Sequence, residues 1–166
     1  ILIHEDVKDS FVKAFGEEMK VLHGEDIKAD RHYVRIVNDK AFARVTSYID
    51  GADVIYGGSY DPVTRFIEPT IIDNPALDSP VMTEEIFGPI FPIITLDDKG
   101  KSFKDKVIDF VTEREKPLAF YYFGKDVVRL FRGWYTSTGT VYLKARNPHK
   151  GRFSTVQSRQ PFAQRK

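Results

Sequence analysis

The order of apolar and polar positions predicts helices alternating with strands along most of the chain. Four stretches carry apolar side chains spaced by three and four residues, as one face of a helix requires: 7–22, 42–49, 103–111 and 127–134. Short apolar runs lie around them and are expected to be strands: 1–3, 53–56, 65–72, 90–96, 118–123 and 140–143. Some of these runs are apolar on both faces, which is typical of strands covered by helices on either side. The pattern therefore predicts an α/β domain, a three-layer sandwich with a largely parallel sheet.

Local signals mark where several of these elements begin and end. Asn38 or Asp39 is suited to cap the second helix, because short polar side chains accept hydrogen bonds from free N–H groups at a helix start. Gly51 follows that helix and can end it. Pro69 lies inside the run 65–72 and has no N–H to donate, so we expect an edge strand or a bulged one there.

The composition is that of a folded globular protein. Of the 166 residues, 42% are hydrophobic and 30% are charged, which differs from the low hydrophobicity of disordered chains. No apolar run approaches the roughly 20 residues that a membrane helix needs. The first residues lack the basic and apolar regions of a signal peptide. We therefore expect a cytoplasmic protein with no membrane partner.

The charges are distributed unevenly along the chain. Residues 1–126 contain all 24 acidic residues and 16 of the 25 basic ones, a net charge of −8, whereas residues 127–166 carry +9. Beyond about Lys144 neither a helical nor a strand period is visible. We expect one partial domain over 1–141 and a basic tail over 142–166 that is disordered or aberrant. The tail has too few aromatic residues to stack nucleic-acid bases, so no nucleic-acid partner is expected.

Cysteine is absent from the sequence, and the four histidines are scattered. Without cysteine the chain has no disulfide, no thiolate nucleophile and no cysteine-based zinc site. The histidines lack the spacing of metal ligands, so we expect ordinary structural histidines and no metal site.

The most informative motif precedes the apolar run 90–96. Glu84 and Glu85 stand next to each other, followed by Phe87 and a Gly-Pro turn. A carboxylate can accept hydrogen bonds from both hydroxyls of a ribose, and an aromatic side chain can pack against a flat ring. The alternative is a turn at the start of a strand with two solvated acids, and a motif this short does not by itself decide between them.

Further segments, in the same order and without large gaps, resemble the aldehyde dehydrogenase superfamily. The motif 84–89 resembles the cofactor motif of that family. Residues 114–121 are similar to a stretch typical of its class 3, fatty-aldehyde-type branch. Other segments that resemble family motifs are 35–38, 56–58, 65–71 and 137–141. The resemblance extends over about residues 1–141.

The resemblance implies a reaction and two cofactor-binding residues. Enzymes of this family oxidise an aldehyde to a carboxylic acid: a cysteine thiolate attacks the carbonyl, a hydride passes to NAD or NADP, and a water activated by a glutamate releases the acyl group. By position in the motif, Glu85 would bind the hydroxyls of the nicotinamide ribose and Phe87 would contact the nicotinamide. Glu84 would be structural. The partners implied are an aldehyde substrate and further copies of the complete enzyme, as a dimer or tetramer.

The sequence also departs from the family pattern. The catalytic cysteine, the general-base glutamate, the oxyanion asparagine and the cofactor domain of the family all precede the matched region. We therefore expect a fragment with no catalytic residue of its own that is inactive alone. The alternative is a non-catalytic interaction or regulatory protein that reuses the α/β scaffold.

Overall fold

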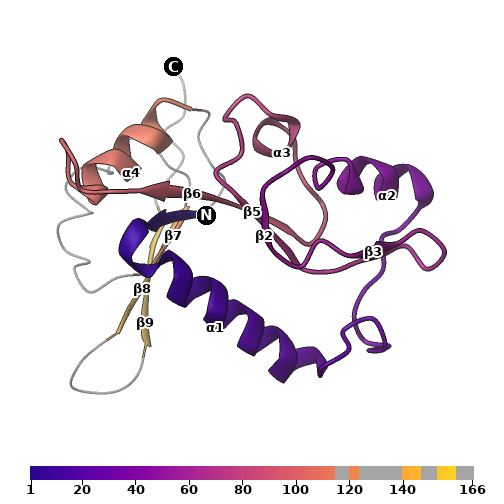
Figure 1. The fold of residues 1–166 in the computed structure, drawn as a ribbon. Coiled ribbons are helices and arrows are strands. Elements are labelled where there is room, and N and C mark those ends of the chain that lie inside the picture. Colours follow the sequence, from indigo (N-terminus) through magenta and orange to yellow (C-terminus); the bar gives the residue numbers. More distant parts are fainter. Residues whose placement is uncertain (115–119, 124–139, 147–152, 160–166) are drawn as a thin grey trace. The chain divides into compact units, whose positions relative to one another are not determined.

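A computed structural model describes residues 1–114, 120–123, 140–146 and 153–159 (Figure 1). The chain divides into two compact units, residues 1–97 and 98–166. The first unit contains the motif 84–89 and the elements around it. Every helix in the described part of the chain is too short or too polar to cross a membrane.

A four-stranded sheet forms the centre of the first unit. Its strands are β1 (Leu2–His4), β6 (Ile90–Leu96), β5 (Thr70–Asp73) and β2 (Val54–Tyr56), in that spatial order. The strands β1 and β5 both run parallel to β6, and β2 is antiparallel to β5. The prediction of an α/β fold with a largely parallel sheet is therefore confirmed.

Helices cover both faces of this sheet, which gives the three expected layers. The long helix α1 (Glu5–His23) lies on one side, while α2 (Asp39–Thr46) and the short α3 (Pro80–Thr83) lie on the other (Figure 1). Asn38 caps α2, as one of the two predicted alternatives: its side-chain oxygen accepts a hydrogen bond of 2.8 Å from the N–H of Ala41.

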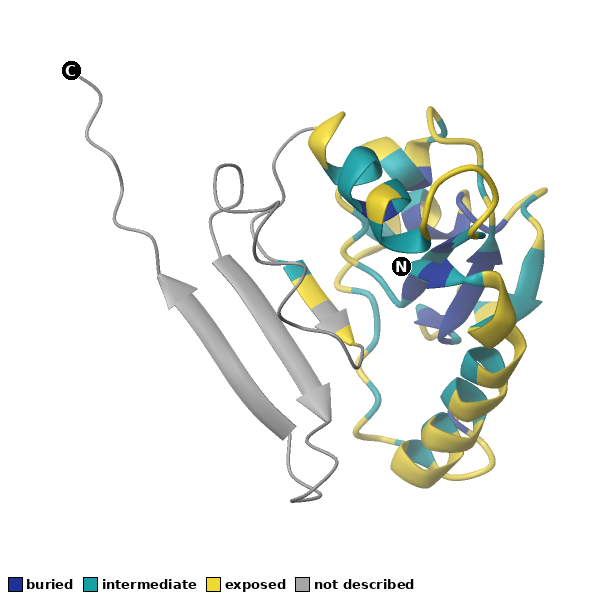
Figure 2. Cartoon of the chain, turned by 90° about the vertical axis from the view of Figure 1, so that its left-hand side faces the viewer, coloured by how far each residue is buried: buried dark blue, intermediate teal, exposed yellow. Residues whose placement is uncertain are grey.

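The two sides of the sheet have separate apolar cores. Successive strand residues point to opposite faces, so Ile71 packs on the α1 side with Ile3 and Ile93, and Ile72 packs on the α2 side with Val45. Figure 2 shows buried residues concentrated in the strands, whereas α1 is exposed or half-buried along its length. The core thus lies between the sheet and its helices, and α2 contributes buried residues to it whereas α1 does not.

The predicted strand 65–72 is two strands. β4 (Phe66–Ile67) pairs antiparallel with β3 (Tyr60–Asp61) in a small separate sheet, and β5 begins after Pro69. The prediction of an edge strand is wrong for β5, which lies between β6 and β2, because Pro69 falls outside the ladder and costs it no hydrogen bond. The irregular register lies in the neighbouring strand instead, between Val54 and Tyr56.

The Gly-Gly turn after β2 lies directly against Pro69, which separates β4 from β5. Gly57 has a φ of +72°, and a Cβ atom on it would be 2.1 Å from the carbonyl oxygen of Pro69. Only glycine combines that backbone conformation with so close an approach. The second glycine, Gly58, donates its N–H to the Thr70 hydroxyl at 3.0 Å.

The second unit contains one helix and three strands among its described residues. The helix α4 (Phe103–Thr112) and the strand β7 (Phe120–Phe123) fall within or next to the predicted ranges. β7 pairs parallel with β8 (Thr140–Arg146), and β8 pairs antiparallel with β9 (Phe153–Arg159). The predicted helix 127–134 lies outside the described residues.

The strands β8 and β9 occupy part of the stretch 142–166, for which no regular structure was expected. The two strands are joined by a ladder of backbone pairs from Thr140↔Arg159 to Arg146↔Phe153. Such a ladder depends on backbone N–H and C=O groups and needs no apolar period. The proposed division of the chain at residue 141 stays a prediction.

Candidate functional site

The motif forms a loop between α3 and β6. Glu84 ends α3, and β6 begins at Ile90. Phe87 has a φ of 45°, a left-handed backbone conformation that is uncommon and strained for a residue other than glycine. Its aromatic side chain is 75% exposed. Strained backbone of this kind often occurs at binding sites and must be maintained by its surroundings.

Glu84 contributes to that support. Its carboxylate accepts a hydrogen bond of 2.6 Å from the hydroxyl of Tyr48 and lies 3.9 Å from the guanidinium of Arg44. Burial raises the pKa of the Tyr48 phenol, and the hydrogen bond to Glu84 raises it further. Glu84 therefore ties the start of the loop to the end of α2, in agreement with the structural role that its place in the motif implies.

Arg44 binds the next two residues of the loop through their backbone. Its Nη1 donates to the carbonyl oxygen of Glu85 at 3.0 Å, and its Nη2 donates to that of Ile86 at 2.8 Å. Nη1 also donates to the hydroxyl of Tyr48. Further along, a Cβ atom on Gly88 would be 2.7 Å from Cγ1 of Val45. Arg44 and Val45 of α2 thus lie against four residues of the loop: Glu84, Glu85, Ile86 and Gly88.

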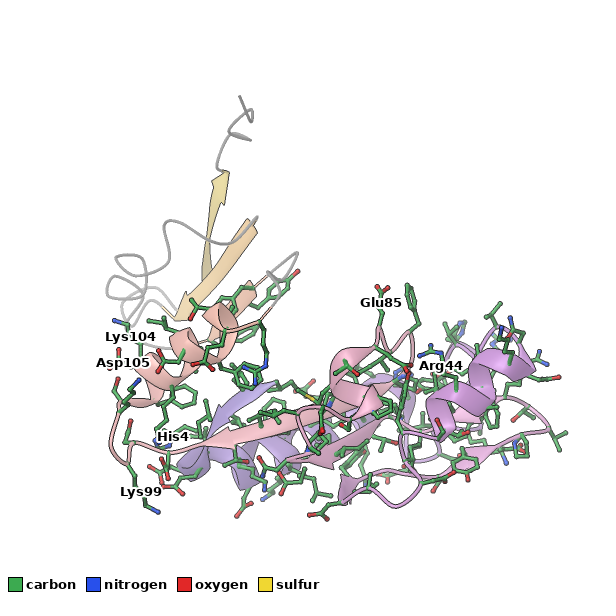
Figure 3. The ribbon with its side chains drawn as sticks, turned by 90° about the horizontal axis from the view of Figure 1, so that it is seen from above. His4, Arg44, Glu85, Lys99, Lys104 and Asp105 are labelled. Carbon is green, nitrogen blue, oxygen red and sulfur yellow. The ribbon has the colours of Figure 1, made fainter. Side chains whose placement is uncertain are left out.

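The side chains of Glu85 and Phe87 are the exception. Both are exposed, and within the described residues the carboxylate of Glu85 makes no hydrogen bond or ion pair. Figure 3 shows it projecting away from the ribbon, while Arg44 reaches from α2 toward the loop. A carboxylate without a protein partner can accept two ribose hydroxyls, and the exposed ring can contact a flat heterocycle. The exposure of both side chains is compatible with the predicted contact to the nicotinamide end of NAD(P), which stays a prediction.

A cavity of about 350 Å³ lies beside this site, with Tyr48 in its wall. It is lined by residues of the segments 47–53, 72–76 and 79–81. Neither Glu85 nor Phe87 lines it, and both side chains are exposed to solvent. The part of the chain that the structure describes holds no group of three histidine, aspartate or glutamate side chains placed to bind a metal ion.

Sequence reasoning did not identify Arg44 and Tyr48 as part of this site. Tyr48 is one of the apolar positions of the stretch 42–49, and the charged Arg44 lies between them without matching any motif. Their spacing is nevertheless informative, because residues four apart lie on the same side of a helical turn. The guanidinium of Arg44 lies 5.6 Å from the centre of the Tyr48 ring.

Comparison with known proteins gives matches of one kind. Residues 1–150 match the model of the aldehyde dehydrogenase family. The chain is 41% identical over 128 residues to the 4,4'-diaponeurosporen-aldehyde dehydrogenase of Staphylococcus aureus, covering 76% of this chain and 27% of that protein. It is 40% identical over 126 residues to the dimeric NADP-preferring aldehyde dehydrogenase of Rattus norvegicus, with the same two coverages.

Solved structures agree with the sequence matches. The substrate-bound state of Staphylococcus aureus AldH superposes with a TM-score of 0.76 and 34% identity, covering 95% of this chain and 35% of that one. The betaine aldehyde dehydrogenase of the same organism, in complex with NAD⁺, gives a TM-score of 0.66 and 25% identity, covering 86% and 30%. The chain thus spans about a third or less of each of these relatives. From its sequence, its fold and the motif loop, the chain belongs to the aldehyde dehydrogenase family, a family of NAD(P)-dependent oxidoreductases.

Proposed function

We propose that this chain is part of an NAD(P)-dependent aldehyde dehydrogenase that oxidises an aldehyde to a carboxylic acid, and that it binds the nicotinamide ribose. Glu85 would accept hydrogen bonds from the two ribose hydroxyls, and Phe87 would pack against the nicotinamide end. The observation that carries the proposal is an exposed carboxylate and an exposed aromatic ring in a loop whose backbone is bound by Arg44 of α2 and whose first side chain is bound by Tyr48.

The chain's residues would contribute binding and orientation. Glu85 holds the sugar by two hydrogen bonds to a charged acceptor, which are stronger than neutral ones. Phe87 covers one end of the bound group and excludes water from it. NAD(P)⁺, when bound, supplies the hydride acceptor. Correct placement of that acceptor relative to the aldehyde accounts for a large part of catalysis by proximity.

Replacement of Glu85 by glutamine tests this assignment in a complete enzyme. The protein to use is a chimaera in which the 126 aligned residues of this chain replace their counterparts in the Rattus norvegicus relative. Glu85→Gln should lower kcat/KM for NAD(P)⁺ by about tenfold or more, since a hydrogen bond to a charged group contributes about 1.5–3 kcal/mol. Steady-state formation of NAD(P)H measures the effect.

The matched control is Glu17→Gln, which removes a carboxylate from the exposed side of α1. It should leave kcat/KM for NAD(P)⁺ unchanged. If Glu85→Gln also left it unchanged while thermal unfolding showed an intact fold, Glu85 would not be the ribose ligand.

We also infer that the chain by itself does not oxidise aldehydes. The reaction of the family uses a cysteine thiolate, and this sequence contains none. Purified chain mixed with NAD(P)⁺ and a panel of aliphatic aldehydes should form no NAD(P)H above the buffer background. Turnover that scaled with the concentration of the chain would contradict the inference.

The complete enzyme is proposed to be a homo-oligomer, a dimer or a tetramer. One relative at 40% identity is named as dimeric. Light scattering coupled to size-exclusion chromatography of the chimaera measures the assembly, and a monomer at micromolar concentration would contradict this part of the proposal.

A further inference from the structure

We infer that Arg44 is a positioning residue for Glu85: it fixes the two peptide units that follow Glu85 and so presents the Glu85 carboxylate to the ribose. The inference rests on the proposed function of Glu85. It assigns to α2, a helix that does not carry the cofactor motif, a role in cofactor affinity.

The first step is the geometry of the two hydrogen bonds. Arg44 donates from two different nitrogens of one rigid, planar guanidinium to the carbonyl oxygens of Glu85 and Ile86. Each carbonyl belongs to a planar peptide unit, so the orientations of two consecutive units are set together. Fixing these units fixes the backbone dihedrals of Ile86 and limits those of Glu85. The direction in which the Glu85 side chain leaves the loop follows from them.

The second step is the strain that comes immediately afterwards. Phe87 adopts its left-handed conformation one residue beyond the second bound carbonyl. A conformation of this type persists only where neighbouring contacts over-determine it. Arg44 supplies that constraint on one side, and the close approach of Gly88 to Val45 supplies it on the other. Both contacts come from α2.

The third step separates positioning from simple anchoring. Tyr48, two residues beyond α2, also binds the loop, but it does so through the side chain of Glu84. Tyr48→Phe removes that hydrogen bond and the hydroxyl that accepts from Arg44 Nη1, but it keeps the two carbonyl oxygens to which Arg44 donates. If Arg44 acted only as an anchor, the two residues would be interchangeable. If it positions Glu85, loss of Arg44 should affect NAD(P)⁺ binding much more than loss of the Tyr48 hydroxyl.

The experiment compares Arg44→Ala, Arg44→Lys, Tyr48→Phe and the exposed α2 control Lys40→Ala in the chimaera. Arg44→Ala should raise KM for NAD(P)⁺ about tenfold, the factor that corresponds to loss of about 1.4 kcal/mol, and should leave KM for the aldehyde within about twofold. Arg44→Lys should recover only part of the loss. A lysine ammonium can still donate to a carbonyl oxygen, but it lacks the planar fork that binds two carbonyls at once. Tyr48→Phe and Lys40→Ala should stay within about twofold of the parent. Equal effects of Arg44→Ala on both KM values, or equal effects of Arg44→Ala and Tyr48→Phe, would overturn the inference.

A double-mutant cycle with Glu85→Gln separates the two proposals. If Arg44 acts through Glu85, Arg44→Ala should have little further effect on KM for NAD(P)⁺ once Glu85 is replaced. A tenfold effect in both backgrounds would overturn the role of Arg44 and leave that of Glu85 intact. No effect of Glu85→Gln alone would instead refute the proposed function.

A second measurement covers the case in which Arg44→Ala prevents the chimaera from folding. Three-bond couplings between the amide and Hα protons of Ile86 and Phe87 report on the φ angles of the loop directly; they are measured by NMR on the chain itself, with Arg44→Lys in place of alanine. They should move from the parent's values toward conformational averages, because the left-handed backbone of Phe87 loses part of its support. The couplings of β6 residues, and those of Ile86 and Phe87 in Lys40→Ala, should match the parent. Parent-like couplings at Ile86 and Phe87 in Arg44→Lys would overturn the inference.

Discussion

The two helical layers on the central sheet differ in how they are attached. The helix α1 has 19 residues and none of them is buried, whereas α2 has eight residues, of which Phe42, Val45 and Thr46 are buried. The core on the α2 side contains eight buried residues, and that on the α1 side contains three. In this unit the longer helix is therefore not the one that buries more residues against the sheet.

Polar contacts reinforce the difference. On the α1 side, Lys8 pairs with Asp73 and His23 pairs with Asp30, both partly buried, whereas the pairs made by Lys13 and Lys20 are exposed. On the α2 side, Arg44 and Tyr48 bind the motif loop by hydrogen bonds. The comparison shows that α2 is packed more completely than α1. We therefore expect α2 to be a fixed platform for the candidate site and α1 to be a cover that adjusts its position more readily.

The largest expected loss of stability comes from truncating a buried isoleucine in either of the two cores. Ile71 and Ile72 are adjacent in β5, are at most 1% exposed and point to opposite faces. Replacing either by alanine should destabilise the chain by about 2–5 kcal/mol. Ile72→Ala should cost more, because the more completely buried α2 side can relax less around the cavity. Urea unfolding measures both, and a larger cost for Ile71→Ala would contradict the picture of α1 as an adjustable cover.

A smaller effect is expected from adding one methyl group on each side. A Cβ atom on Gly88 would be 2.7 Å from Val45 Cγ1, and one on Gly16 would be 2.8 Å from Tyr56 Cε2. Gly88→Ala should destabilise by about 1–3 kcal/mol, because it overpacks a fixed core. Gly16→Ala should be close to neutral, since it gains about 1 kcal/mol of helix propensity and the Tyr56 ring can shift.

The double variant Gly88→Ala, Val45→Ala provides the control for steric overlap. It removes the methyl group that the new Cβ atom would meet, so the total destabilisation should be less than the sum of the two single variants. Strict additivity of the unfolding free energies would show that overlap is not the cause.

Removal of the cap of α2 should have an effect of about 1 kcal/mol. Asn38→Ala deletes the acceptor of the hydrogen bond from the Ala41 N–H. Asn38→Asp keeps an acceptor at the same place and should retain most of the stability. Thermal unfolding of both variants measures the difference, and equal losses would show that the side-chain hydrogen bond does not stabilise α2.

The smallest effect is expected on the exposed side of α1. Lys13 and Glu17 lie 4.0 Å apart and are 79% and 67% exposed. Pairs of this kind contribute only a few tenths of a kcal/mol, so Lys13→Ala should change the unfolding free energy by less than about 0.5 kcal/mol. A loss above 1 kcal/mol in urea unfolding would mean that the outer face of α1 matters more than its exposure suggests.

Much of the fold was predictable because it depends on local patterns. The spacing of apolar residues located α1, α2 and β6, and Asn38 was one of two suitable caps. The break at Pro69 was harder to place. Proline marks a discontinuity, but whether the following strand is central or at an edge depends on neighbours that are distant in sequence.

The candidate site likewise has a part that the sequence predicted and a part that it did not. The sequence by itself determined the alternation of helices and strands, because that depends on residue types at short spacing. It also contained the motif with Glu85 and Phe87, and the resemblance of several motifs in order indicated the family. Only the tertiary structure decided that Arg44, 41 residues before Glu85, binds the loop backbone. A hydrogen bond to a backbone carbonyl oxygen does not depend on the side chain of the accepting residue. The residue types at 85 and 86 therefore could not predict the hydrogen bonds from Arg44.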